Sequence, residues 1–116
     1  YIGGARLAAL DLRGNPSLER LFCTDCGLRS LDVSGCSALT ALNCSGNRIG
    51  SLTVGRLPAL EALNCSFNDL ASLDLSGCPV LDELDCRGNP PLESVVLAPG
   101  CEPALLYKDP GTGIVY

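Results

Sequence analysis

Apolar and polar residues alternate in short runs along this chain, and the runs recur at a fixed spacing. The segment LERLFCTDCGLRSLDVSGCSA (18–38) aligns without gaps with LTALNCSGNRIGSLTVGRLPA (39–59) and with LEALNCSFNDLASLDLSGCPV (60–80). A fourth copy begins at residue 81, and residues 7–17 resemble half of one copy. A period of 21 residues predicts a stack of similar units, because one such unit cannot bury its apolar face alone.

Each copy divides into two similar halves with the pattern L-x-x-L-x-[LVC]-x-x-[NCL]. Leu18, Leu21 and Cys23 occupy the same places in the first half as Leu28, Leu31 and Val33 in the second. The alternation within L-x-[LVC] predicts a short strand with one buried face. Gly-Asn or Gly-Cys follows most strands and indicates a turn. No segment has the apolar stripe of a helix, and the prolines fall between the strands.

These patterns together predict a β-rich, right-handed parallel solenoid of about four coils, with strands on two sides and almost no helix. We expect residues 1–6 to form a lead-in, residues 7–97 to form the repeats, and residues 98–116 to form a cap. The chain starts at Tyr1, so we interpret it as a mature protein or a fragment.

The repeat L-x-x-L-x-C-x-x-N-x-L-x-x-L-D-[LV]-S-x-C resembles the leucine-rich repeat family in its short bacterial 21-residue form. LTALNCSGN, LEALNCSFN and LRSLDVSGC are similar to that consensus, and the tail is similar to the ending of bacterial surface members. The repeats of plant immune receptors share L-x-L-S-G-C but are longer, which makes them a distant second match. Leu57, Thr53 and Cys26 depart from the pattern of their neighbours.

The resemblance implies a curved solenoid without catalytic residues that binds a protein, or in second place a glycan. It also implies a bacterial protein of the cell surface or the extracellular space. The alternative is a structural spacer that presents another domain and has no ligand of its own. The scarcity of aromatic residues on the expected outer faces keeps this alternative open, and an open edge strand permits edge-to-edge self-association.

Composition narrows the chemistry further. The net charge is −5 and there is a single lysine, which argues against a nucleic-acid partner. No apolar run reaches the length of a membrane span. Histidine is absent, which removes Ser-His-Asp and Cys-His catalysis. We expect no enzymatic activity and no cofactor.

The eight cysteines are expected to be free thiols. Four of them recur at the same strand position and should point inward as small apolar side chains: Cys23, Cys44, Cys65 and Cys86. Cys36 and Cys78 form a second column, and Cys101 is expected to be the most exposed or paired. Cys23 and Cys26 have the spacing of a redox or zinc motif, so a thiol oxidoreductase is the one enzymatic alternative. The repeat explains this spacing without such chemistry.

Outward positions are the candidate functional residues. On the strands of the first half-repeat, the candidate binding residues are Arg20, Phe22, Asn43, Asn64, Asp85 and Arg87. On the other side, a column of Asp11, Asp32, Thr53 and Asp74 is expected to bond the adjacent backbone, with a weak calcium site as the alternative. The turn asparagines are expected to be structural, because buried amides must satisfy backbone groups: Asn15, Asn47, Asn68 and Asn89.

Overall fold

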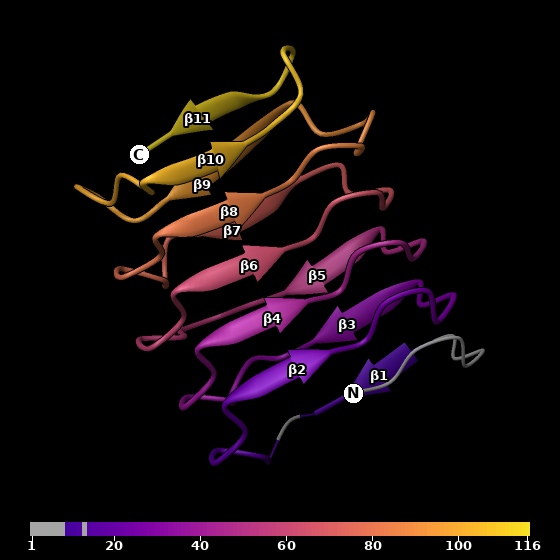
Figure 1. The fold of residues 1–116 in the computed structure, drawn as a ribbon, viewed down its shortest axis with the longest axis vertical. Helices are drawn as coiled ribbons and strands as arrows, with labels where there is room; N and C mark the ends of the chain where they lie inside the picture. Colours follow the sequence, from indigo (N-terminus) through magenta and orange to yellow (C-terminus); the bar gives the residue numbers. More distant parts are fainter. Residues whose placement is uncertain (1–8, 13) are drawn as a thin grey trace.

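The chain folds into a parallel β-solenoid of about five turns, and none of the residues that the structure describes lies in a helix (Figure 1). The computed structural model describes residues 9–12 and 14–116. The strands are β1 (Ala9–Asp11), β2 (Arg20–Phe22), β3 (Ser30–Asp32), β4 (Ala41–Asn43), β5 (Ser51–Thr53), β6 (Ala62–Asn64), β7 (Leu73–Leu75), β8 (Glu83–Asp85), β9 (Ser94–Leu97), β10 (Leu105–Tyr107) and β11 (Gly113–Val115).

The strands lie in two layers, and the chain crosses from one layer to the other after each strand (Figure 1). The front sheet contains five strands in the order β10-β8-β6-β4-β2. The back layer consists of two three-stranded sheets, β1-β3-β5 and β11-β9-β7. All pairs are parallel, and Leu21 pairs with Leu42, which pairs with Leu63. The register therefore advances by one repeat per coil, as predicted.

The core fills the space between the layers. The middle residue of β2, β4, β6 and β8 is a buried leucine, flanked by exposed or half-buried residues. This alternation is the two-residue period of a strand with one buried face. The apolar steps between strands, such as Leu28, Ile49 and Leu70, are fully buried as well. Side chains from every coil thus contribute to one continuous core.

The structure has about five turns, slightly more than the four predicted. Residues 98–116, for which a capping segment was expected, contain β10 and β11. β10 pairs with β8 and β11 pairs with β9, so the segment continues both layers. The offset is irregular, since Leu106 pairs with Leu84 and Ile114 with Val95. This irregularity hid the last coil in the sequence. The expected lead-in, residues 1–6, lies outside the described residues.

The back layer is interrupted between β5 and β7, which are not paired. The turns after β3 and β5 differ. In the turn after β3, Gly35 takes a left-handed conformation with φ of 91°. In the turn after β5, the left-handed glycine is Gly55, which stands one position earlier in the repeat. Leu57 N then donates to Gly77 O of the next coil at 3.1 Å, whereas Cys36 N and Cys78 N bond within their own turns. The shifted turn separates the strands that precede it.

The gap between β5 and β7 forms a hollow with a volume of about 600 Å³. Leu52 on β5 is half-buried there, although the corresponding Leu31 and Leu73 are buried. The departures from the repeat noted in the sequence, Thr53 and Leu57, lie in the same coil as this interruption.

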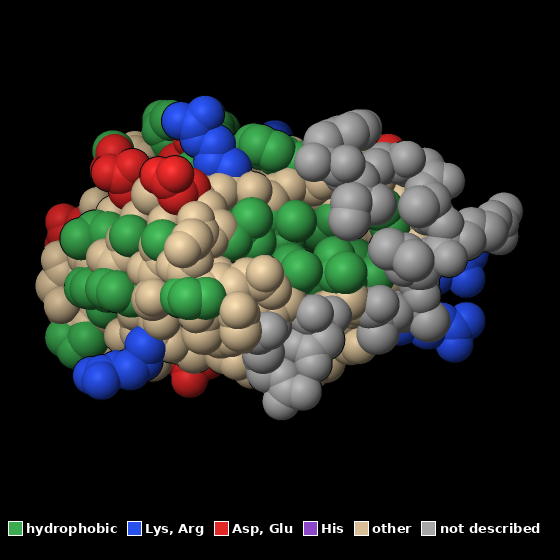
Figure 2. All heavy atoms as spheres, turned by 90° about the horizontal axis from the view of Figure 1, so that it is seen from below, with side chains coloured by type: hydrophobic (Ala, Val, Ile, Leu, Met, Phe, Trp, Pro, Cys, Tyr) green, Lys and Arg blue, Asp and Glu red, His purple; other side chains and the backbone are tan. Residues whose placement is uncertain are grey.

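Seen from the end that carries β1 and β2, apolar side chains are visible in the middle of the molecule, with charged side chains toward the rim (Figure 2). Leu10, Leu12 and Leu18 of the first coil are half-buried and pack against the core. Their equivalents one coil later, Leu31, Val33 and Leu39, are buried. Described residues therefore cover the apolar interior less completely at this end than in the middle of the stack.

Candidate binding face

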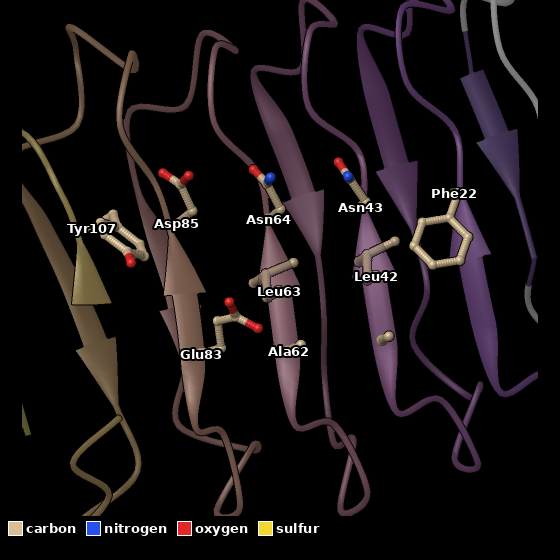
Figure 3. A pocket seen from close by; sticks show the side chains of 10 residues that line it. Phe22, Leu42, Asn43, Ala62, Leu63, Asn64, Glu83, Asp85 and Tyr107 are labelled. Atoms are coloured by element: carbon tan, nitrogen blue, oxygen red, sulfur yellow. The ribbon is translucent and has the colours of Figure 1, made fainter. Parts of the chain in front are cut away.

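The outward side chains of the front sheet form two rows that cross the strands. The row at the strand starts contains Arg20, Ala41, Ala62, Glu83 and Leu105, and the row at the strand ends contains Phe22, Asn43, Asn64, Asp85 and Tyr107. Because alanine is small, the centre of the sheet is hollowed. The hollow has a volume of about 240 Å³ and is lined by residues from β2, β4, β6, β8 and β10 (Figure 3).

An aromatic ring stands at each end of this hollow (Figure 3). Phe22 on β2 is 38% exposed and Tyr107 on β10 is 42% exposed. Four strand steps of about 4.8 Å put their backbones about 19 Å apart. Two partly exposed rings at this separation can anchor a partner at both ends of the hollow.

The asparagines between the rings are held in one orientation by their own strands. Asn43 Oδ1 accepts hydrogen bonds from Ser45 N at 3.1 Å and Ser45 Oγ at 2.7 Å, and Asn64 Oδ1 accepts from Ser66 in the same way. Neither Asn Nδ2 group has a partner among the described residues. The N-x-S pattern therefore presents two fixed amide donors at successive strands, oriented before any partner binds.

Charges are distributed unevenly over the hollow. Arg87 forms a two-pronged ion pair with Asp85, with Nη2–Oδ2 at 2.8 Å and Nε–Oδ1 at 3.0 Å. The guanidinium of Arg87 also lies 4.8 Å from the centre of the Tyr107 ring. Asp85 raises the pKa of Arg87 through this hydrogen bond and its charge. Glu83 is exposed on β8 and lines the hollow, whereas Arg20 is exposed on β2 and does not line it.

The structure brings four of the six predicted binding residues into the lining: Phe22, Asn43, Asn64 and Asp85. Arg87 lies next to the hollow through Asp85 and Tyr107, while Arg20 lies outside the lining on β2. The alternation also predicted that Ala41, Ala62 and Glu83 point outward, but they were not among the candidate binding residues, and Tyr107 was not predicted at all. Tyr107 was missed because the last coil was read as a cap; the alternation in LLYKD was the available signal.

The aspartates of the back layer have the local role expected of them. Asp32 Oδ1 accepts from Ser34 N at 2.9 Å, and Asp74 Oδ1 accepts from Ser76 N at 2.9 Å. Hydrogen bonds from Ser76 lower the pKa of Asp74. The side chain of Asp11 lies outside the described part of the chain. Among the described residues, no group of three or more Cys, Asp or Glu is placed to hold a metal ion.

Three of the four turn asparagines form a buried ladder. Asn68 Nδ2 donates to the carbonyl oxygens of Cys44 at 3.0 Å and Cys65 at 3.1 Å, which belong to adjacent coils. Its Oδ1 accepts from Ile49 N at 3.0 Å. Asn47 and Asn89 make the equivalent bonds one coil before and after. Each amide thus joins two coils.

Asn15 does not belong to this ladder, which corrects the prediction for that residue. It is exposed and donates to Leu12 O within its own turn at 2.8 Å. Leu18 N donates to Asn15 O, and one coil later Leu39 N donates to Cys36 O in the same way. Asn15 is therefore the equivalent of Cys36 and belongs to the column of Cys36 and Cys78. Gly-Asn occurs both at Asn15 and at Asn47 and Asn89, although Asn15 lies in the other half of the repeat. The sequence alone therefore suggested that the three residues were equivalent.

The eight cysteines are free and buried. Cys23, Cys44, Cys65 and Cys86 are fully buried in one inward column, as predicted. Cys101 was expected to be the most exposed or paired, but it is free and buried. Its N–H donates to Ala98 O, just as Cys78 N donates to Leu75 O one coil earlier. Two extra residues before Cys101 concealed that it extends the column of Cys36 and Cys78.

Burial makes the thiols poor nucleophiles. Burial raises the pKa of Cys23 to about 11, with a further contribution from Cys26. Burial also raises the pKa of Cys78 and Cys86 to about 11. Cys26 is fully buried, and its thiol donates to Thr24 O at 3.3 Å. A reactive thiolate is favoured by exposure and a lowered pKa. Both thiols of the Cys23–Cys26 pair are buried, and the pKa of Cys23 is raised.

Comparison of the chain with family models, with curated proteins and with solved structures finds no match. The described residues include no helix long and apolar enough to cross a membrane.

Proposed function

We propose that this chain is a non-enzymatic binding module of the leucine-rich-repeat type that holds a protein on its front sheet. The hollow between Phe22 and Tyr107 carries the proposal (Figure 3). It combines two partly exposed rings with the amide donors of Asn43 and Asn64. Rigid aromatic anchors surrounded by polar groups are typical of protein-binding surfaces. A glycan is the second choice of ligand.

The leucine-rich-repeat assignment is supported by three features of the structure. The strands repeat at the spacing seen in the sequence, leucines and cysteines fill buried columns, and asparagines join adjacent coils. By resemblance to bacterial members, the module belongs on a cell surface or outside the cell. The buried thiols support a role without thiol chemistry, since burial raises the pKa of Cys23 to about 11.

The test is selection of ligands from a displayed library of random peptides on the immobilised protein. We expect binding peptides whose affinity falls about tenfold or more in Ala62→Arg, because the long side chain would fill the hollow where Ala62 now lies. The control is Ser51→Arg, an exposed position on β5 of the back layer. Biolayer interferometry on both variants gives the affinities.

The spacer alternative predicts a different result. If the monomeric protein selects no peptide, or if selected peptides bind Ala62→Arg as tightly as the natural chain, the front sheet is not a ligand site. If the selected peptides lose affinity for Ser51→Arg and not for Ala62→Arg, the binding site lies on the back layer.

A further inference from the structure

The outward rows of the front sheet are complementary to themselves when the order of the strands is reversed. β6 is the central strand of the five. Reversal about β6 places Phe22 opposite Tyr107 and Asn43 opposite Asp85 in the row at the strand ends. In the other row it places Ala41 opposite Glu83, and Arg20 opposite Leu105. The aromatic rings of Phe22 and Tyr107 therefore face each other. The small Ala41 faces the longer Glu83, and the amide of Asn43 faces the carboxylate of Asp85.

We propose that the protein partner of the front sheet is a second copy of this chain, bound face to face about a twofold axis that runs along β6. Such an axis reverses the order of the strands and leaves their direction unchanged, so each contact away from the axis occurs twice. This inference rests on the proposed function and names its partner.

The charges favour this arrangement over its main rival. A twofold axis perpendicular to the strands would place each strand against its own copy, with Glu83 opposite the Asp85 of the other chain. Like charges facing each other across an interface cost several kcal/mol. With the axis along β6, Glu83 extends over the small Ala41, and no outward strand residue faces one of like charge.

The contacts have suitable chemistry. Asn43 Oδ1 is occupied by Ser45, which leaves its Nδ2 to donate toward the Asp85 carboxylate of the other copy. Phe22, Leu105 and Tyr107 are three of the large apolar side chains that the chain exposes, and all lie on this face. Offset or edge-to-face packing of Phe22 on Tyr107 would stabilise both ends of the dimer.

The size of the face is sufficient. The molecule measures 34 × 30 × 18 Å, and Figure 1 looks along the shortest of these axes onto the front sheet. The strands of the front sheet are three residues long, so an interface of ~800 Å² per partner would also include the turns that flank the sheet on this side of the molecule, whose outline is 34 × 30 Å. The net charge of −5 on each copy opposes association, so added salt is expected to tighten the dimer.

The first experiment changes the charge opposite Glu83. In Ala41→Glu, a new carboxylate faces Glu83 of the other copy twice, and the dimer dissociation constant should rise about tenfold or more. In Ala41→Lys, the opposite charge should lower that constant. The two side chains are similar in length, so opposite shifts cannot come from a folding defect. Ser30→Glu, at the equivalent position on β3, is the control. Sedimentation equilibrium from micromolar to millimolar concentration measures each constant.

The second experiment locates the axis. Ala62 faces its own copy across the axis, with the two sheets about 10 Å apart. This distance is too long for a disulfide but is within reach of a short bismaleimide. Ala62→Cys should cross-link to a dimer, and Ser51→Cys on the back layer should not. The natural buried thiols supply the background in both variants.

Three results would overturn the dimer. These are a monomer at every concentration, a dimer that is indifferent to both Ala41 variants, or cross-linking of Ser51→Cys as efficient as that of Ala62→Cys. A monomer that still binds selected peptides through Ala62 would overturn this inference and leave the proposed function standing. A monomer that selects no peptide would overturn both.

Discussion

At the scale of single residues, the buried asparagines have the largest identifiable role in joining the coils. Asn68 bonds carbonyl oxygens of two coils and also accepts from Ile49 N. Its relative exposure is 4%, so water cannot readily replace these bonds. A buried donor that loses its partner retains the full cost of its desolvation.

We therefore expect Asn68→Ala to lower the free energy of unfolding by about 2–4 kcal/mol, because it leaves Ile49 N without an acceptor and creates a small cavity. The matched control is Asn15→Ala, since Asn15 is exposed and makes one local bond. Its cost should be about 1 kcal/mol or less. Urea unfolding of both variants measures the difference, and equal costs would contradict the role of the ladder.

The sequence predicted the residues of the candidate face in part. Phe22, Asn43, Asn64 and Asp85 were identified because they occupy outward positions of a regular repeat. Tyr107 could not be aligned, because β10 is offset by one residue from the period: Tyr107 pairs with Asp85. The partners that fix the amides, such as Ser45, were visible as a pattern, but their geometry was not.

At the scale of elements, the turn after β7 shows how closely adjacent coils approach. A Cβ atom on Gly77 would overlap Gly55 O and would lie 3.0 Å from the Arg56 Cα atom. Both neighbours are backbone atoms that cannot rotate away. Glycine is required at this position for close contact and not for an unusual φ, since Gly77 is not among the residues with positive φ.

Gly77→Ala is accordingly expected to destabilise the protein by about 2 kcal/mol or more, since the two coils must separate to admit one methyl group. Gly111→Ala is the control, because a Cβ there meets nothing within 4 Å. Its stability should stay within about 0.5 kcal/mol of the natural chain. The midpoints of thermal unfolding compare the two, and a Gly77→Ala protein as stable as Gly111→Ala would refute the contact.

The strands themselves were predictable, and the interruption between them was not. The short alternating runs identified strands such as β4 and β6, because the apolar period of two is a local property. The gap between β5 and β7 depends on where one left-handed glycine falls. Gly55 stands one position before the place that Gly35 occupies. The position of Gly55 affects how two adjacent coils pair, so the gap cannot be predicted from the sequence of β5 or β7 alone.

At the scale of the whole molecule, the buried thiols connect stability to pH. Cys23, Cys78 and Cys86 each have a pKa raised by burial to about 11, from an ordinary value of 9.0. Between these values the folded chain keeps protons that the unfolded chain loses. Stability from these groups is therefore complete below about pH 9 and is lost as the pH rises toward 11.

We expect the free energy of unfolding to decrease above about pH 9, with a slope of up to about 1.4 kcal/mol per pH unit for each such thiol. Urea unfolding at a series of pH values gives the slope. Tyrosine and lysine also titrate in this range, so the control is the triple variant Cys23→Ala, Cys78→Ala and Cys86→Ala. Its slope should be shallower, whatever its absolute stability. Identical slopes would remove the thiols as the cause.

The interruption of the back layer also gives the solenoid unequal stiffness on its two sides. Five strands of the front sheet are hydrogen-bonded without a break, whereas the back layer is divided into halves that meet at the hollow beside Gly55 and Gly77. A bending load should therefore open or close the gap in the back layer, while the continuous front sheet keeps nearly the same length. The distance between Phe22 and Tyr107 would change little during such bending, so the surface proposed to recognise a partner lies on the side that deforms least.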